Sequence, residues 1–255
     1  MAKILLLGAK GNLGCQLEKV LAPENEVTAW DQEEIDITDK ELVMRKIRSI
    51  KPDIVINSAA YNAVDKCEEE AGWTVAQKVN GLAPGYLADA CLETGSVLVH
   101  YSSDYVFRGD RPEGYTEEDK PEPVNNYGKS KLLGEQELIK RSGQGLKWYL
   151  LRVSKLFGPQ GAAAGAKPSF FDLILKLSQD KDEFNMVHQD EISCFTYTPD
   201  LARATRDLLV NKYPLGIYHL VNSGPASWYE AAHFLFALTG REDIKLNPIR
   251  SADFD

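Results

Sequence analysis

The chain has 255 residues, with 29 lysines and arginines against 38 aspartates and glutamates, so its formal net charge is −9. This acidic balance disfavours nucleic acids and anionic membranes as main partners. A chain of this length fits one large α/β domain or a nucleotide-binding domain with a smaller appendage. No apolar run is long enough to span a bilayer, and the N-terminal strand lacks the features of a signal peptide. We therefore expect a cytoplasmic protein.

Short apolar runs alternate with helix-like segments through the first part of the chain. The strand-like runs are 4–7, 27–30, 54–57, 97–101 and 148–153, and a later run, 216–221, returns to the same sheet. Continuous apolar runs of this length are typical of parallel strands that are buried on both faces. Right-handed crossovers then place helices on both sides of one sheet. The pattern predicts an α/β fold with a doubly wound, parallel, Rossmann-like sheet.

After the fifth strand this alternation weakens, which predicts a small, discontinuous substrate-binding domain. We expect a dinucleotide-binding domain over 1–154, to which 196–222 returns, and a small domain made of 155–195 and 223–255. Four further segments complete the description. They are a helix over 65–95 interrupted near Gly81 and Pro84, a surface loop over 109–126, a Gly/Ala-rich lid or linker over 158–168, and a helix over 227–238.

A glycine-rich turn follows the first strand. Gly8, Gly11 and Gly14 form a GxxGxxG pattern between that strand and a helix that runs to Leu21. The first glycine allows a tight turn, the second lets backbone approach a phosphate, and the third lets the helix pack on the strand. The helix dipole favours an anion at the same place. The pattern predicts dinucleotide binding, although a plain strand–loop–helix connection can show it too.

Asp31 ends the second strand, about twenty residues after the central glycine, where a carboxylate can accept a hydrogen bond from a ribose 2′-hydroxyl. No lysine or arginine lies between Val27 and Thr38 to hold a 2′-phosphate, although Arg45, Arg48 or a remote residue could reach it. An aspartate that starts a turn gives the same pattern. The predicted cofactor is NADH or NADPH, and we expect NADH to bind at least as well.

Tyr127 and Lys131 are four residues apart in the segment YGKSK, which puts phenol and ammonium on one face of a helix. A nearby ammonium favours the phenolate, so the spacing predicts a tyrosine with a lowered pKa that can donate a proton near neutral pH. Ser103 ends the fourth strand, and its hydroxyl can bind a substrate carbonyl. Each feature alone is common in structural roles. Together with the glycine turn they predict a carbonyl reductase with Ser103, Tyr127 and Lys131 as catalytic residues.

Over nearly its whole length the chain resembles the extended short-chain dehydrogenase/reductases, and more narrowly the dTDP-4-dehydrorhamnose reductases. Beyond the glycine turn and YGKSK, the resemblance rests on the segments at 36–39 (DITD), 57–65 (NSAAYNAVD), 102–107 (SSDYVF), 151–154 (LRVS) and 216–222 (GIYHLVN). It implies reduction of the 4-keto group of a dTDP-linked deoxysugar by hydride transfer, with Tyr127 as the proton donor.

The resemblance also implies a set of binding residues. Those on the cofactor side are Gly8, Gly11, Asn12, Leu13, Gly14, Asp31, Asp36, Ile37, Ala59, Ala60, Tyr61 and Lys131. Those on the substrate side are Val64, Ser103, Asp104, Tyr105 and Lys155. Asn80 is expected to hold a water near Lys131. The implied partner is a nucleotide sugar, and a homodimer stays open.

Three departures from the family favour other functions. Lys155 stands where the family usually has a tryptophan, the segment 189–196 lacks the family's glycine and proline, and the sequence ends where relatives continue. They favour a regulatory subunit that binds NADP without turnover, similar to the β subunit of methionine adenosyltransferase, or a reductase of another nucleotide sugar. The intact Tyr127 and Lys131 favour a reductase.

The cysteines and histidines suggest no further chemistry. The four cysteines are widely spaced without a CxxC pair, so we expect them to be reduced and to behave as small apolar side chains. No spacing of histidine, cysteine and carboxylate residues predicts a metal site.

Overall fold

A computed structural model describes residues 1–163, 166–250 and 253 of the chain. Its centre is a six-stranded sheet in the order β10-β5-β4-β3-β1-β2, and every adjacent pair is parallel. The strands are β1 (Lys3–Leu7), β2 (Glu26–Trp30), β3 (Ile54–Asn57), β4 (Val97–Ser103), β5 (Lys147–Val153) and β10 (Gly216–His219). The predicted α/β class and parallel, Rossmann-like sheet are therefore confirmed.

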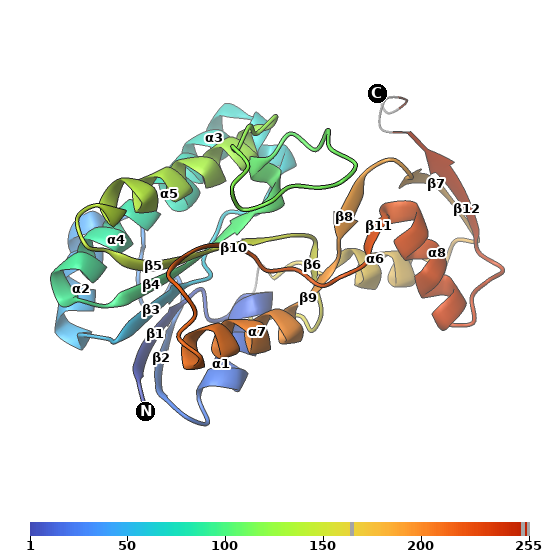
Figure 1. Cartoon of the computed structure of the whole chain (residues 1–255). Coiled ribbons are helices and arrows are strands. Elements are labelled where there is room, and N and C mark those ends of the chain that lie inside the picture. The colour runs from blue at the N-terminus through green and yellow to red at the C-terminus, as the bar shows by residue number, and fades with distance from the viewer. Residues whose placement is uncertain (164–165, 251–252, 254–255) are drawn as a thin grey trace.

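Helices cover both faces of this sheet (Figure 1). On one face lie α2 (Lys40–Ile50), α4 (Ala83–Thr94) and α5 (Asn126–Ser142), and on the other lie α1 (Asn12–Leu21) and α7 (Thr198–Val210). The side chains of β1 show why the strand sequences are continuously apolar: both faces of the sheet are buried. Leu5 and Leu7 belong to the core under α2 and α4, whereas Ile4 and Leu6 belong to the core under α1 and α7.

The order in which strands are added to the sheet reverses at β1. The next strand, β2, lies on one side of β1, and β3 and the later strands lie on the other side. Ligands of doubly wound sheets bind at such a point, beyond the C-terminal strand ends. Gly8 leaves β1 there with φ +74°, and a Cβ on it would lie 2.6 Å from the backbone nitrogen of Ala59, which follows β3. The predicted glycine turn therefore lies at the ligand-binding edge of the sheet.

The predicted interruption of the long helix is a π-helical turn. The segment consists of η1 (Asp65–Glu68), α3 (Glu70–Ala76), the π-helix η2 (Gln77–Leu82) and α4, so the interruption falls at Gly81 and Pro84 as expected. The predicted surface loop also forms, between the short helix η3 (Asp104–Val106) and α5.

The rest of the chain forms a smaller body beside the C-terminal strand ends (Figure 1). This small lobe, residues 170–194 and 225–249, contains α6 (Phe170–Leu177), β7 (Glu183–His188), β8 (Ile192–Cys194), β11 (Pro225–Ser227), α8 (Trp228–Leu238) and β12 (Lys245–Ile249). Ile174, Ala232, Phe236 and Ile244 form its core. The two short strands β6 (Leu156–Phe157) and β9 (Thr196–Tyr197) pair in parallel between the two bodies. The exact domain bounds stay a prediction.

Sequence analysis found only one helix of the small lobe, α8, and none of its strands. These strands pair only as two-stranded ribbons, β7 with β12 and β8 with β11, so their sequences lack the long apolar runs of a buried sheet. Across residues 1–163, 166–250 and 253, no helix combines the length and hydropathy needed to cross a bilayer.

Gly14 is where the turn tolerates a side chain least. A Cβ there would lie 2.1 Å from the carbonyl oxygen of Gly8. We expect Gly14→Ala to lower the free energy of unfolding by about 1–3 kcal/mol, because helix α1 must move away from the turn. Urea unfolding would measure this. Gly143→Ala is the matched control, since Gly143 has φ −64° and open space at its Cβ position. Equal effects of the two substitutions would contradict the prediction.

Candidate active site

Tyr127 lies in the first turn of α5, at the edge where β4 ends. The side chain of Asn125 accepts a hydrogen bond from the Gly128 amide at 2.7 Å and so caps the helix. The tyrosine is only 9% exposed, and its hydroxyl donates to Oδ1 of Asn62 at 3.3 Å. A buried phenol with its hydroxyl near the sheet edge is suited to proton donation.

Lys131 lies one turn further along α5 and is almost completely buried. Its Nζ donates to the backbone carbonyl of Tyr101 in β4 at 2.6 Å. Burial lowers the pKa of this lysine to about 8, and the charge of Glu135 opposes the shift. The ammonium therefore has a backbone partner, which fixes its position behind the strand end.

The prediction that Lys131 lowers the pKa of Tyr127 is wrong for this structure. Burial raises the pKa of Tyr127, the charge of Asp104 adds to the rise, and a hydrogen-bonding interaction with Ser103 opposes it. The physical reason is that desolvation penalises a phenolate, while the ammonium of Lys131 is directed to the carbonyl of Tyr101. Tyr127 is therefore a neutral phenol that keeps its proton.

Ser103 ends β4 and is 7% exposed. Its hydroxyl donates to Oδ1 of Asp104 at 3.0 Å and accepts from the amide of Tyr105 at 3.2 Å. Tyr105 links Ser103 to Tyr127, because its amide donates to Oγ of Ser103 and its ring meets that of Tyr127 edge to face. Lys131 lies one turn further along α5 and contacts β4, the strand that Ser103 ends.

Aromatic and apolar side chains pack around Tyr127. The predicted cofactor residue Tyr61 and the predicted substrate residues Val64 and Tyr105 belong to one cluster with it. The rings of Tyr105 and Tyr127 meet edge to face, with centroids 5.5 Å apart. This packing lets each ring restrict the orientation of the other.

Asn80, in the π-helical turn, clamps the backbone of Tyr61. Its Oδ1 accepts from the Tyr61 amide at 2.9 Å, and its Nδ2 donates to the Tyr61 carbonyl and to Oγ of Ser130, both at 3.0 Å. The expected water on Asn80 stays a prediction. What the structure shows is that Asn80 orders the segment after β3, which contains Ala59, Ala60 and Tyr61.

The glycine turn and Asp31 border one pocket. Its lining residues are Ala9, Lys10, Cys15, Glu18, Ala29, Asp31, Glu34 and Ala162. The carboxylate of Asp31 accepts from the amides of Lys10 and Gln32, both at 2.9 Å. Lys10 is a cation at this pocket that the residues around Asp31 do not indicate, because it lies 21 residues earlier in the chain. Its ammonium lies 2.9 Å from Glu33 at the exposed rim.

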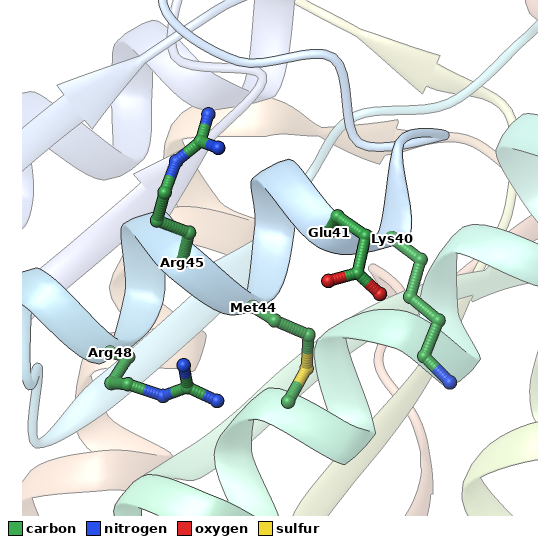
Figure 2. A pocket seen from close by; sticks show the side chains of 5 residues that line it. All are labelled: Lys40, Glu41, Met44, Arg45 and Arg48. Atoms are coloured by element: carbon green, nitrogen blue, oxygen red, sulfur yellow. The ribbon is translucent and has the colours of Figure 1, made fainter.

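Two predicted cofactor residues, Asp36 and Ile37, come just before α2, whereas the arginines of α2 line a separate hollow. Asp36 accepts two hydrogen bonds from Thr38, and Ile37 is buried. Arg45 and Arg48, considered for a 2′-phosphate, instead line a hollow on α2 with Lys40, Glu41 and Met44 (Figure 2). Figure 2 shows Arg45 pointing away from Met44 and Arg48. Arg48 pairs with Glu93, so it does not reach the pocket at Asp31.

The predicted lid or linker contacts the glycine turn. Asn12 accepts from the Gly161 amide at 2.8 Å, and its Nδ2 donates to the Lys167 carbonyl at 3.1 Å. The Ala163 amide donates to the Lys10 carbonyl at 2.9 Å. Residues 164 and 165 of this segment lie outside the described residues. The predicted cofactor residue Asn12 is thus tied to a segment about 150 residues later in the chain.

Lys155 lies beside Tyr105, which is also a predicted substrate residue, and the substrate role of both stays a prediction. Its ammonium pairs with Glu191 and lies 4.2 Å from the centroid of the Trp228 ring and 5.4 Å from that of Tyr105. The sequence does not indicate Glu191 and Trp228 as neighbours of Lys155, because both come from the small lobe, whose path across the sheet edge no local pattern predicts. The altered segment 189–196 was the one signal that pointed to this region.

The RmlD substrate binding domain family matches residues 2–255. The chain belongs to this family. The spore coat polysaccharide biosynthesis protein SpsK of Bacillus subtilis is 39% identical over 248 residues, 97% of this chain and 83% of that protein. The dTDP-4-dehydrorhamnose reductase of Escherichia coli is 34% identical over 95% of this chain and 80% of its own length.

Solved structures of family members share the fold over the whole chain. The dTDP-4-dehydrorhamnose reductase of Bacillus anthracis, in complex with NADP, aligns with a TM-score of 0.88 and 33% identity, covering 100% of this chain and 87% of its own. That of Clostridium acetobutylicum aligns with a TM-score of 0.89 and 35% identity, covering 99% and 85%. These similarities confirm the predicted family.

Burial of Lys131 makes stability depend on pH. Its pKa is about 8 in the folded chain against an ordinary 10.5, so from pH 8 to 10.5 the unfolded chain binds more protons and stability rises. Below pH 8 the cost of burying the charge is fully present. We expect wild type to gain on the order of 2 kcal/mol relative to Lys131→Met between pH 7 and pH 10. Urea unfolding at both pH values measures this gain, with the exposed Lys245→Met as control. A difference in free energy of unfolding between wild type and Lys131→Met that is the same at both pH values would contradict the prediction.

Proposed function

We propose that this chain is an NAD(P)H-dependent oxidoreductase that reduces the 4-keto group of a dTDP-linked deoxysugar, dTDP-4-dehydrorhamnose, to an alcohol. The observation that carries the proposal is that Ser103 and Tyr127 both contact Tyr105 at the sheet edge, while Lys131 of the same helix is held on the carbonyl of Tyr101 in β4. Relatives that cover most of the chain and are named dTDP-4-dehydrorhamnose reductases support the substrate.

The residues at the glycine turn fit a dinucleotide. At Gly11 the nearest atom to a Cβ would be the Gly8 carbonyl at 3.2 Å, and Asp31 and Ala29 line the adjoining pocket. Gly8, Gly11, Asn12, Leu13 and Gly14 would hold the diphosphate, and Asp31 the adenosine ribose. The bound dihydronicotinamide supplies the hydride that becomes the new C–H bond of the sugar.

The chain's own groups bind the carbonyl and supply the proton. The hydroxyls of Ser103 and Tyr127 donate to Asp104 and Asn62, and a carbonyl oxygen placed between them would replace those acceptors. As hydride reaches the carbonyl carbon, its π bond breaks, the oxygen becomes an alkoxide, and Tyr127 gives its proton to that oxygen. Hydride and proton together complete a two-electron reduction.

The raised pKa of Tyr127 suits this direction of proton transfer. A buried neutral phenol keeps its proton until the alkoxide, a much stronger base, forms beside it. The ammonium of Lys131 is held by the Tyr101 carbonyl, so Lys131 would contribute through the other role predicted for it, binding the cofactor.

Tyr127→Phe should abolish turnover and leave the fold and cofactor binding unchanged. Incubation with dTDP-4-dehydrorhamnose and NADH or NADPH, followed at 340 nm, measures the rate, and we expect a loss of at least about 100-fold. The exposed Tyr213→Phe is the matched control. A full rate in Tyr127→Phe would contradict the mechanism. Wild type that binds cofactor but oxidises neither form with this sugar would contradict the substrate and favour a regulatory cofactor-binding subunit.

Asp31 should set cofactor preference through its charge. Two amides hold its carboxylate at the pocket, so it cannot turn freely from a 2′-phosphate, and like charges there cost on the order of a few kcal/mol. We expect NADH to bind at least as well as NADPH, and Asp31→Asn to shift the ratio toward NADPH by about tenfold. Tryptophan fluorescence gives both dissociation constants. NADPH binding more tightly to wild type would show that Lys10 outweighs Asp31.

We also propose a cytoplasmic location and a homodimer as the assembly. The four cysteines, all of them free thiols, support the first, and neither proposal affects the chemistry above.

A further inference from the structure

Lys155 is a buried cation between the sheet and the small lobe. It lies between β5 and β6, its backbone has φ +42°, and its side chain is only 6% exposed. A left-handed conformation is costly for a residue with a Cβ, and a lysine is rarely buried unless it is paired. Both features indicate that contacts around Lys155 hold it in place.

These contacts come from both bodies of the protein. Glu191, just before β8, pairs with the ammonium, and Trp228, the first residue of α8, offers its ring face at 4.2 Å. From the sheet side, Tyr105 presents its ring, whose centroid lies 5.4 Å from the ammonium. The ammonium of Lys155 therefore contacts both the small lobe and Tyr105, which lies two residues after the end of β4.

Tyr105 in turn contacts both residues that are predicted to bind the carbonyl, Ser103 and Tyr127. Its ring meets that of Tyr127 edge to face, and its amide donates to Oγ of Ser103. Its carbonyl would lie 2.1 Å from a Cβ on Gly128, so the start of α5 packs directly on the Tyr105 backbone. A displacement of Tyr105 must therefore displace Ser103 or Tyr127.

We propose that Lys155 is a positioning residue that couples the small lobe, through Tyr105, to the proton donor Tyr127. The proposal rests on the function proposed above and deepens it. The turnover rate then depends on how the small lobe lies against Tyr105, because Lys155 acts through its contacts with Glu191, Trp228 and Tyr105.

Lys155→Met tests the coupling without unfolding the chain. Methionine keeps much of the side-chain volume over Trp228, and Glu191 is 40% exposed, so its carboxylate can turn to water. We expect kcat per cofactor-binding site to fall about tenfold, because Tyr105 loses its cation and Tyr127 its fixed orientation. The dissociation constant for the reduced cofactor should stay within about twofold, because the glycine turn is untouched.

Two variants separate positioning from general stability. Lys155→Arg keeps the charge and should retain kcat within about threefold, whereas the exposed Lys245→Met, which breaks a pair with Glu183 inside the small lobe, should change nothing. The double variant Lys155→Met/Glu191→Gln should be no slower than Lys155→Met alone, since both changes act through one pair. A wild-type kcat in Lys155→Met, or equal losses in Lys155→Met and Lys245→Met, would overturn the proposal.

Hydrogen exchange tests the same coupling without turnover. In Lys155→Met the amides of 104–107 and of 191–195 should exchange faster together, and those of β1 and β2 should not change. Unchanged exchange at 104–107 would overturn the coupling. If wild type proves inactive toward the sugar while both segments still respond, the proposed function fails and the coupling stands. If wild type is active and Lys155→Met matches it, only the coupling fails.

Discussion

The structure depends on a backbone approach that only glycine permits. At the end of β1 the carbonyl of Gly8 lies where a Cβ on Gly14 would be, and Gly8 itself lies against the backbone of Ala59. These contacts join β1, α1 and the segment after β3 into one tight junction. Because the strands are parallel, the same edge receives Ser103 from β4 and, through α5, Tyr127 and Lys131. A change of backbone path at this junction would move every group of the site relative to the others.

The sequence predicts the large body well because its signals are local. Buried parallel strands read as apolar runs, and the glycine turn, Asp31 and Ser103 each end a strand that can be recognised on its own. The small lobe gave no such signal, since its strands pair as two-stranded ribbons and not as a sheet buried on both faces. The partners of Lys155 come from these ribbons and from the start of α8. They could not be predicted before the path of the chain was known.

The directions in which the pKa values of Tyr127 and Lys131 shift could not be predicted from the sequence pattern either. Four-residue spacing places Tyr127 and Lys131 on one face of a helix, but it does not say what each polar group meets. In the structure the lysine meets a backbone carbonyl and the tyrosine meets a desolvating environment, so burial dominates the pKa of both. Lys131 and Lys155 are both buried beside the sheet edge. The first is held by backbone and the second by side chains of another lobe, so only the second can respond to movement of that lobe.

The π-helical turn at 77–82 has a consequence for which changes of length this chain tolerates. A π turn holds one residue more than the α-helical path, and here that register directs Asn80 onto the backbone of Tyr61 and onto Ser130. Removing a single residue from this turn would restore an α-helix and remove the offset that directs Asn80 at its partners. Asn80 could then no longer bridge the loop after β3 to α5. Even with the flanking helices in place, the deletion would separate the cofactor-side loop from the helix that carries the proton donor.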